Sequence, residues 1–303
     1  MLSFGRRTSS SLPESLVSRS LTRHILVAGS RTGTGRAVPE GASAWDPVAF
    51  EDAVEATLGR VLVNPVGKLV VSSIRRRVRI IPFARFTTDP IAASAETLPL
   101  DHSGATVRGE RIRWCQRHVC TERETESTWV GSGRGSASRI AFTPQMWPRM
   151  PGRVPADEVL LHELVHAMQH TCGVLSWRPE GMGYDTFAEV CAITITNMYR
   201  SHFFGSRAHL RANHGRRGSF RGDPYPVRDA PDLIYFFGPS EARSREWRLL
   251  DRFCRLQPAL AAALRALPLA VCPYNPLRDR AQEMQTGSLD GLGSWGPPRP
   301  VTR

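Results

Sequence analysis

The feature that most constrains this chain is an H-E-x-x-H run at residues 162–166. In a helix, residues four positions apart lie one turn above each other on the same face, so the imidazoles of His162 and His166 can reach one ion. Glu163 lies beside them, close enough to polarise a water at that ion. This spacing is typical of zinc-binding helices, and we predict one Zn²⁺ per chain at this position.

The flanking sequence predicts a buried helix over about 155–172. Pro155, Asp157 and Glu158 favour the first turn of a helix, and Gly173 favours its end. Apolar residues cover most of the remaining circumference, as expected for a helix inside a protein. Histidines and a glutamate on such a helix need polar partners, and a metal supplies one. The glutamate between the histidines is then expected to act as the general base of a zinc hydrolase.

A catalytic zinc needs a third protein ligand. The downstream side chains that can supply it are Glu180, Asp185, Glu189, His170, His202, His209 and His214. We favour Glu189, which lies 23 residues after His166 on a mostly apolar helix predicted over 186–200, because this placement resembles that of the third ligand in glutamate-type zincins. Thr186 and Glu189 also fit a capping box, in which Glu189 would only close the helix start. We place His170 beside the site or at the surface, because three ligands on one straight helix surround an ion poorly.

The run from Asp157 to Ala167 resembles the active-site helix of zincin-like bacterial effector and toxin domains, closest to the NleD-like type III effector zinc metalloproteases. The resemblance covers about residues 45–280, and softer similarities lie at 183–185, 196–199, 211–215 and 273–279. It implies a zincin-like fold, Glu189 as third ligand, and proteolysis of a host protein. Many glutamate-type zincins carry an aspartate four residues after that glutamate, where it holds a histidine ligand. This chain has Ile193 at that position, so another residue must supply the hydrogen bond that orients the histidine.

A protease of this kind also needs a donor that stabilises the tetrahedral oxyanion. The candidates are Tyr199, His214, Tyr274 and Arg278. His214 lies in a segment where nothing obvious would bury it, and Arg278 follows a proline-bracketed turn. A surface loop, and an ion pair between Arg278 and Asp279, explain these residues equally well.

The predicted fold class is α+β: a small twisted sheet packed on the active-site helices, with disordered tails. Helices are expected at 48–63, 155–172, 186–200 and 243–265, and strands at 78–83, 111–114, 125–130 and 139–143. We expect the strand at 140–143 to be the sheet edge on which substrate lies. The glycines at 131–135 are expected to let the preceding loop close over a ligand.

Three regions follow from composition. Residues 1–44 are rich in serine and arginine with only two acids, so we expect a disordered segment with the composition of a secretion or targeting signal. A plain solvated tail has the same composition. Residues 45–283 form the predicted metalloprotease domain, and residues 284–303 a flexible tail rich in glycine, proline and serine.

The formal net charge of +12 favours acidic partners over basic ones. Residues 200–221 contain six arginines and no acidic residue, and therefore form a basic stretch. The alternative function is therefore a catalytically silent zincin-like module that binds an acidic host partner through this arginine-rich surface. Nucleic acid is not expected as a partner, because few aromatic residues interleave the arginines.

Membrane and secretory signals are not expected. The longest apolar stretch, 258–272, is broken by Arg265 and Pro268, short of the roughly 20 residues that span a bilayer. The apolar run at 25–28 is too short for a Sec-type signal peptide. Six scattered cysteines indicate free thiols, and we expect a monomer. The resemblance implies secretion by a bacterial injection system into a host cell.

Overall fold

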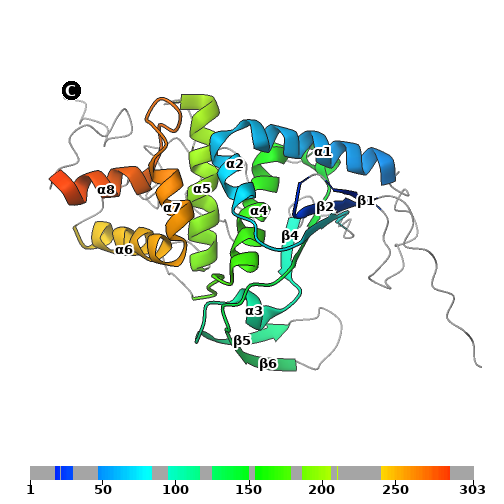
Figure 1. The fold of residues 1–303 in the computed structure, drawn as a ribbon, viewed down its shortest axis with the longest axis horizontal. Coiled ribbons are helices and arrows are strands. Elements are labelled where there is room, and N and C mark those ends of the chain that lie inside the picture. The colour runs from blue at the N-terminus through cyan, green and yellow to red at the C-terminus, as the bar shows by residue number, and fades with distance from the viewer. Residues whose placement is uncertain are drawn as a thin grey trace, which may run out of the picture.

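The computed structural model describes residues 18–20, 22–29, 47–83, 95–116, 125–149, 154–178, 186–205, 210 and 240–286. Over these residues the chain has an α+β fold, with a five-stranded sheet, a two-stranded hairpin and helices packed around them (Figure 1). The predicted fold class is therefore confirmed at this level. No helix in the described ranges is long and apolar enough to cross a membrane.

The main sheet has the strand order β1-β2-β3-β7-β4. Its strands are β1 (Ser18–Ser20), β2 (Ile25–Ala28), β3 (Val78–Ile81), β7 (Ser138–Phe142) and β4 (Ala95–Pro99). The three inner strands are parallel, whereas β1 and β4 run antiparallel to their neighbours. Alternate side chains of the inner strands are fully buried and form the core, among them Ile25, Val27, Ile80, Ile140 and Phe142.

The strand predicted at 140–143 exists as β7, but its predicted position at the sheet edge is wrong. β7 lies between β3 and β4, so β4 forms that end of the described sheet. In the register of this pair, Thr97 of β4 is opposite the buried Ile140, which places Thr97 on the helix-covered face. The alternation of apolar residues identifies β7 as a strand. It does not show which strands lie beside it, because β3 and β4 are distant from β7 in sequence.

The prediction that residues 1–44 are disordered is also wrong in part. β2 lies inside the sheet between β1 and β3, and Ile25 and Val27 are 0% exposed. A four-residue apolar run in a segment rich in serine and arginine does not stand out by composition. The folded part of the chain therefore begins before residue 45, and most of the remaining N-terminal residues lie outside the described ranges.

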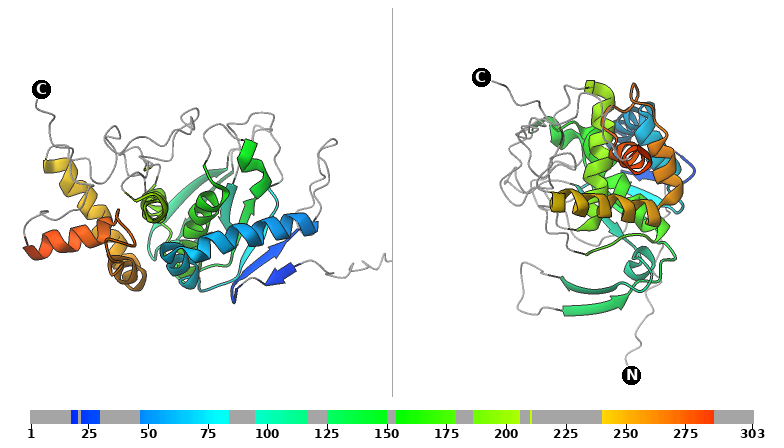
Figure 2. Two further views of the ribbon diagram at one scale, coloured as in Figure 1. Left: turned by 90° about the horizontal axis from the view of Figure 1, so that it is seen from above. Right: turned by 90° about the vertical axis from the view of Figure 1, so that its left-hand side faces the viewer.

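Two helices cover the buried face of the sheet. α1 (Pro47–Val63) contacts β2, and α4 (Ala156–Cys172) contacts β4, β7 and α1. α2 (Pro65–Ser72) follows α1, and α5 (Phe187–Phe204) packs along α4 (Figure 2). α4 is thus enclosed by the sheet, α1 and α5, which explains why nearly all of its side chains are buried. The helices predicted at 48–63, 155–172 and 186–200 are confirmed.

Three further helices pack beside α5 and α2: α6 (Ser240–Leu256), α7 (Pro258–Arg265) and α8 (Pro276–Thr286) (Figure 1). The single helix predicted at 243–265 is broken, because Pro258 cannot donate a backbone hydrogen bond and starts α7 instead. The predicted start of the C-terminal tail, residue 284, is too early, because α8 continues to Thr286.

The segment at 131–136 is held by backbone hydrogen bonds and is not free to close over a ligand, contrary to expectation. The predicted hairpin, β5 (Arg111–Gln116) and β6 (Thr125–Val130), precedes it. Backbone amides of the 131–136 segment donate to carbonyls near the hairpin, in α3 (His102–Ala105) and in α4, at 2.8–3.0 Å. Gly135 has φ +80°, and a Cβ there would lie 2.2 Å from the carbonyl oxygen of Thr171. The glycines therefore permit close packing of backbone on the end of α4.

Replacing Ile25 by alanine tests whether β2 belongs to the folded core. Ile25 is fully buried between strands, so we expect the free energy of unfolding to fall by about 2–5 kcal/mol. Arg23→Ala, at an exposed neighbouring position, is the control and should change it by less than about 0.5 kcal/mol. Urea unfolding followed by circular dichroism measures both. Equal, negligible effects would place residue 25 in a disordered tail.

Candidate metal centre

α4 carries both histidines of the H-E-x-x-H run on one buried face. The helix starts after Pro155 and ends at Gly173, whose φ of +70° is the left-handed conformation that commonly stops a helix. His162 is 4% exposed. Its imidazole and that of His166 approach each other with their Nε2 atoms 3.2 Å apart, as the four-residue spacing predicts.

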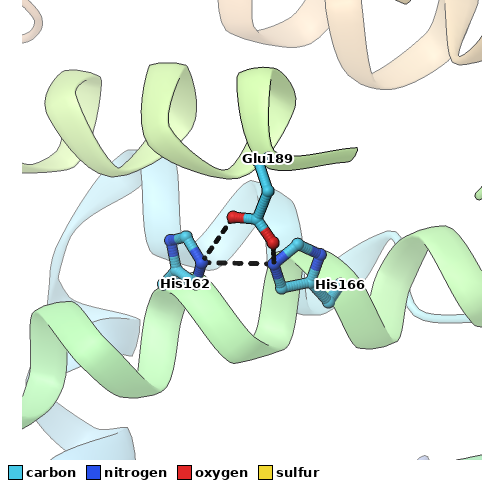
Figure 3. Close-up of side chains that lie close together, drawn as sticks. All are labelled: His162, His166 and Glu189. Atoms are coloured by element: carbon cyan, nitrogen blue, oxygen red, sulfur yellow. Dashed lines mark hydrogen bonds and ion pairs between the residues drawn. The ribbon is translucent and has the colours of Figure 1, made fainter. Parts of the chain in front are cut away.

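α5 brings Glu189 to the same place from the opposite side. Thr186 caps the helix, because its hydroxyl accepts a hydrogen bond from the backbone N–H of Glu189 at 3.4 Å. The carboxylate of Glu189 points to the histidines, with Oε2 3.2 Å from Nε2 of His162 and Oε1 3.2 Å from Nε2 of His166 (Figure 3). Helix capping therefore uses the backbone of Glu189 and leaves its carboxylate to the cluster.

The start of α5 is anchored by a contact that the sequence did not indicate. The guanidinium of Arg252, from α6, lies 4.2 Å from the ring centroid of Phe187. It also donates a hydrogen bond to the hydroxyl of Ser176 at 2.6 Å, and that hydroxyl donates to the buried carboxylate of Glu110. Because Phe187 lies two residues before Glu189, this network helps fix the end of α5 that carries the carboxylate.

The spacing of the three side chains fits a single small ion. Ligand atoms about 2.0–2.1 Å from a tetrahedral zinc lie roughly 3.3–3.4 Å from one another. The observed separations among the two nitrogens and the carboxylate oxygens are 3.2 Å, and one ligand atom from each residue lies within 4.8 Å of the others. Two imidazoles and a carboxylate are also a donor set that zinc accepts, with room for a fourth ligand.

Burial and mutual charge set the protonation of this cluster. Burial alone would raise the pKa of Glu189, but the adjacent imidazoles hold it well below its usual range. Burial alone would lower the pKa of His166, whereas the charge and hydrogen bond of Glu189 raise it to about 9. His166 and Glu189 therefore form an ion pair, which a bound metal would replace.

Glu163 lies next to this cluster with its carboxylate held by the sheet. The hydroxyl of Thr97, on β4, donates a hydrogen bond to Oε2 of Glu163 at 2.5 Å. Burial raises the pKa of Glu163, while the charge of His166 and the hydrogen bond from Thr97 oppose the increase. A carboxylate with a raised pKa beside a group of possible metal ligands is suited to accepting a proton. Thr97 was not found from the sequence, because β4 itself was not predicted.

Gln169 supports one histidine and was also missed. Its Oε1 lies 3.4 Å from Nδ1 of His166, and its side chain is 1% exposed. A hydrogen bond from Nδ1 to this oxygen leaves Nε2 of His166 to face the cluster. Gln169 is three residues after His166 on the same helix, so helical spacing was the signal available for it.

His170 is buried, so the surface position, one of the two places predicted for it, is wrong. It is 1% exposed, and its Nδ1 lies 2.9 Å from the hydroxyl of Ser138 on β7. Burial lowers its pKa well below 6.5, so the ring is neutral. It is a core histidine with a hydrogen-bond partner, one turn beyond the cluster.

Tyr199 is not near the cluster, which contradicts its prediction as an oxyanion donor. Its hydroxyl donates to Oδ2 of Asp157, in the first turn of α4, at 2.6 Å. Ten residues of helix separate it from Glu189, a distance of about 15 Å along the axis. Burial, together with the hydrogen bond to Asp157, raises its pKa. Periodicity alone does not distinguish the two ends of a buried helix.

Arg278 is likewise occupied elsewhere. In α8 it donates hydrogen bonds to the carbonyls of Leu267, Cys272 and Pro273 and pairs with Asp279 at 3.0 Å. It closes the turn between α7 and α8, and the interpretation of an Arg278–Asp279 pair is correct. Tyr274 is buried beside that turn.

Other candidates lie outside the described residues. These are His214, which was predicted as an oxyanion donor, and the alternative ligands Glu180, Asp185 and His209. His202 is described, and its Nδ1 lies 2.7 Å from the carbonyl oxygen of Val271, away from the cluster. Of the basic stretch, Arg200 pairs with Glu158 at 2.6 Å, whereas the remaining arginines lie outside the described ranges.

No family model matches the chain, and no curated protein sequence matches it. The resemblance to zincin-like effectors therefore stays a prediction from the motif residues.

Replacing Glu189 by alanine should lower zinc affinity by more than the roughly 10–100-fold that loss of a supporting hydrogen bond costs, because one of three ligands is removed. Gln169→Leu is the matched comparison and should lower it by about 10–100-fold. Competition with a chromophoric chelator measures both affinities. If Glu189→Ala keeps native zinc affinity and loses only about 1 kcal/mol of unfolding free energy, Glu189 serves as a helix cap.

His170 should make the fold sensitive to acid. The unfolded chain binds a proton on this imidazole near pH 6.5, while the folded protein keeps it neutral. Below about pH 6.5 the unfolded state therefore binds more protons, and stability falls as pH falls, by up to about 1.4 kcal/mol per pH unit. Urea unfolding of the native protein and of His170→Asn, between about pH 5 and 7, measures the difference in slope. Parallel pH profiles would contradict the expectation.

Proposed function

We propose that the protein is a zinc-dependent peptidase that hydrolyses peptide bonds of a protein substrate. The observation that carries the proposal is the convergence of His162, His166 and Glu189, with mutual separations of 3.2 Å, directly beside the buried Glu163. Two helices and a sheet are needed to assemble these four groups. A buried cluster of ionisable groups that fits one metal ion is more typical of a catalytic site than of a structural core.

In the proposed site His162, His166 and Glu189 hold one Zn²⁺. When bound, the ion supplies a Lewis acid that polarises the scissile carbonyl and acidifies a water. Glu163 accepts the proton from the attacking water and delivers it to the leaving amine. The hydrogen bond from Thr97 fixes the carboxylate of Glu163, so that its second oxygen is available for this transfer.

The substrate is proposed to lie along β4. This strand pairs with β7 on one side, and no described strand pairs with its other side. An extended peptide added there would form backbone hydrogen bonds and pass next to α4, which contacts β4. An antiparallel edge strand that borders the helix with the histidines is consistent with the zincin-like fold that the motif resemblance implies. That resemblance also supports a host protein as substrate, reached through a bacterial injection system.

Glu163→Gln tests the chemistry. It should retain about one zinc per chain, because the ligands are untouched, yet lose about 10²–10⁴-fold in turnover with the general base. The full-length protein with zinc is incubated with a cell lysate, and new peptide amino termini are detected by mass spectrometry. The Gln variant with the same metal content is the control. Absence of new termini with the native protein, or equal cleavage by both proteins, would overturn the proposal.

Thr97→Val tests the orientation of the base by the edge strand. It keeps the shape of the side chain but removes the hydroxyl that donates to Glu163, so kcat should fall about 10–100-fold with KM and zinc content unchanged. Thr97→Ser retains the donor and should keep most of the activity. Steady-state kinetics on a peptide from an identified cleavage site measures both. Equal losses in the Ser and Val variants would contradict this role.

A further inference from the structure

The main sheet has one face on which no described helix packs. α1 and α4 contact the strands from the side of the buried Ile80 and Ile140. The alternate residues of the same strands point to the other side, which we call the outer face. Its strand positions, all half-buried or exposed, hold Leu26, Arg79, Ile81, Arg139, Ala141, Glu96 and Leu98. Parallel strands are almost always covered on both faces, so the outer face is expected to meet a partner.

Two arginines lie side by side at the centre of the outer face. Arg79 on β3 is paired with Arg139 on β7 in the register of these parallel strands. Adjacent strands lie about 4.8 Å apart, and like charges at paired positions destabilise a sheet. Within the described part of the chain, neither side chain forms an ion pair with an acid. The two charges therefore remain available to an external anion.

Further arginines extend this positive charge to one end of the sheet. Arg77 precedes β3, lies on the same side as Arg79 by alternation, and is exposed. Its carbonyl oxygen accepts a hydrogen bond from the N–H of Ser138 at 2.9 Å, so the pairing of β3 and β7 continues to it. Arg76 and Arg134 are exposed at the same end, where the guanidinium of Arg76 donates to the carbonyl oxygen of Arg134 at 2.6 Å.

Apolar side chains border these arginines. Leu26 and Leu98 flank the two central arginines in the register of the sheet. Leu100, two residues beyond Leu98 and therefore on the same side, is 71% exposed. Its N–H donates to the carbonyl oxygen of Ala137, just before β7, at 2.9 Å, which places it at the end of the sheet where the arginines gather. Glu96, the acid among the strand positions of the outer face, lies towards the other end of β4.

This combination of side chains fits the surface of an anionic membrane. The planar guanidinium group is suited to phosphate, and each basic residue near an anionic lipid surface strengthens binding about fivefold. An exposed leucine can enter the boundary between head groups and acyl chains. A sheet also presents its side chains together to a flat partner.

Other occupants fit the outer face less well. Sheets that bind single-stranded nucleic acid present aromatic rings on which bases stack, and the described strand positions of this face hold none. A second copy of the chain in the same orientation would bring arginines against arginines, which is unfavourable.

We propose that the outer face of the main sheet docks on an anionic lipid membrane. Arg77, Arg79 and Arg139 contact the lipid phosphates, and Leu100 enters the head-group boundary. The helix with the histidines, α4, packs on the opposite face of the sheet, so docking leaves the cluster on the side away from the lipid. This surface is separate from the proposed peptidase centre and does not depend on zinc.

The test is sedimentation of the full-length protein with vesicles of phosphatidylcholine that contain about 30% phosphatidylserine. Binding should be saturable, and at least about tenfold weaker with phosphatidylcholine alone. Arg77→Gln combined with Arg139→Gln should weaken binding about 25-fold, because two contacts of about fivefold each are lost. Arg248→Gln combined with Arg255→Gln changes the net charge equally at two exposed positions of α6, and should leave binding within about twofold of the native value. Circular dichroism establishes that both variants are folded.

A pair of leucine variants separates a membrane from other anionic partners. Leu100→Ser should weaken vesicle binding at least about fivefold, because an inserted apolar side chain is lost. Leu269→Ser, at a 46% exposed position after α7, should leave it unchanged. Both positions are exposed, so these variants test the surface without depending on the fold. A duplex DNA oligonucleotide should bind more weakly than the vesicles.

Four results would overturn the proposal. They are absence of binding to the phosphatidylserine vesicles, equal losses in the two double arginine variants, equal effects of the two leucine substitutions, and binding of duplex DNA as tight as that of the vesicles.

Discussion

The contact of the Glu189 carboxylate with two imidazoles is the interaction on which the rest of the structure depends. Each oxygen lies 3.2 Å from one histidine, in a position shielded from solvent. Charged groups are buried at such a position only when their partners are placed correctly. A slip of one residue along α5 would turn the carboxylate about 100° around the helix, away from α4. The register between α4 and α5 therefore determines whether the cluster exists.

That register is held at both ends of α5. At its start, the guanidinium of Arg252 from α6 packs on the ring of Phe187, and the hydroxyl of Thr186 caps the helix. Near its end, Tyr199 and Arg200 bond to the acids in the first turn of α4, each at 2.6 Å. Polar contacts are directional, so they specify a relative position that apolar packing alone would leave free to slide.

The sequence predicted those features that depend on local pattern. Helical spacing placed His162 and His166 on one face, and an acid on an apolar helix indicated Glu189. The same reasoning failed where the cause is not local. β2 is too short to be recognised in its polar surroundings, and Thr97 reaches Glu163 only through the pairing of β4 with β7. Tyr199 was misplaced because periodicity shows which face is buried, not which neighbour it meets.

The topology of the sheet also affects when α4, the helix that carries the histidines, can become stable. β2 pairs with β3 through Ile25 and Val78, 53 positions apart, and β3 pairs with β7 through Val78 and Ser138, 60 positions apart. Such long loops must close before any of these pairings contributes, and chains of this kind fold slowly. α4 follows β7 in the chain and packs on it and on β4. The helix that carries the histidines thus gains the part of its packing surface that the sheet provides only after β4 and β7 have paired.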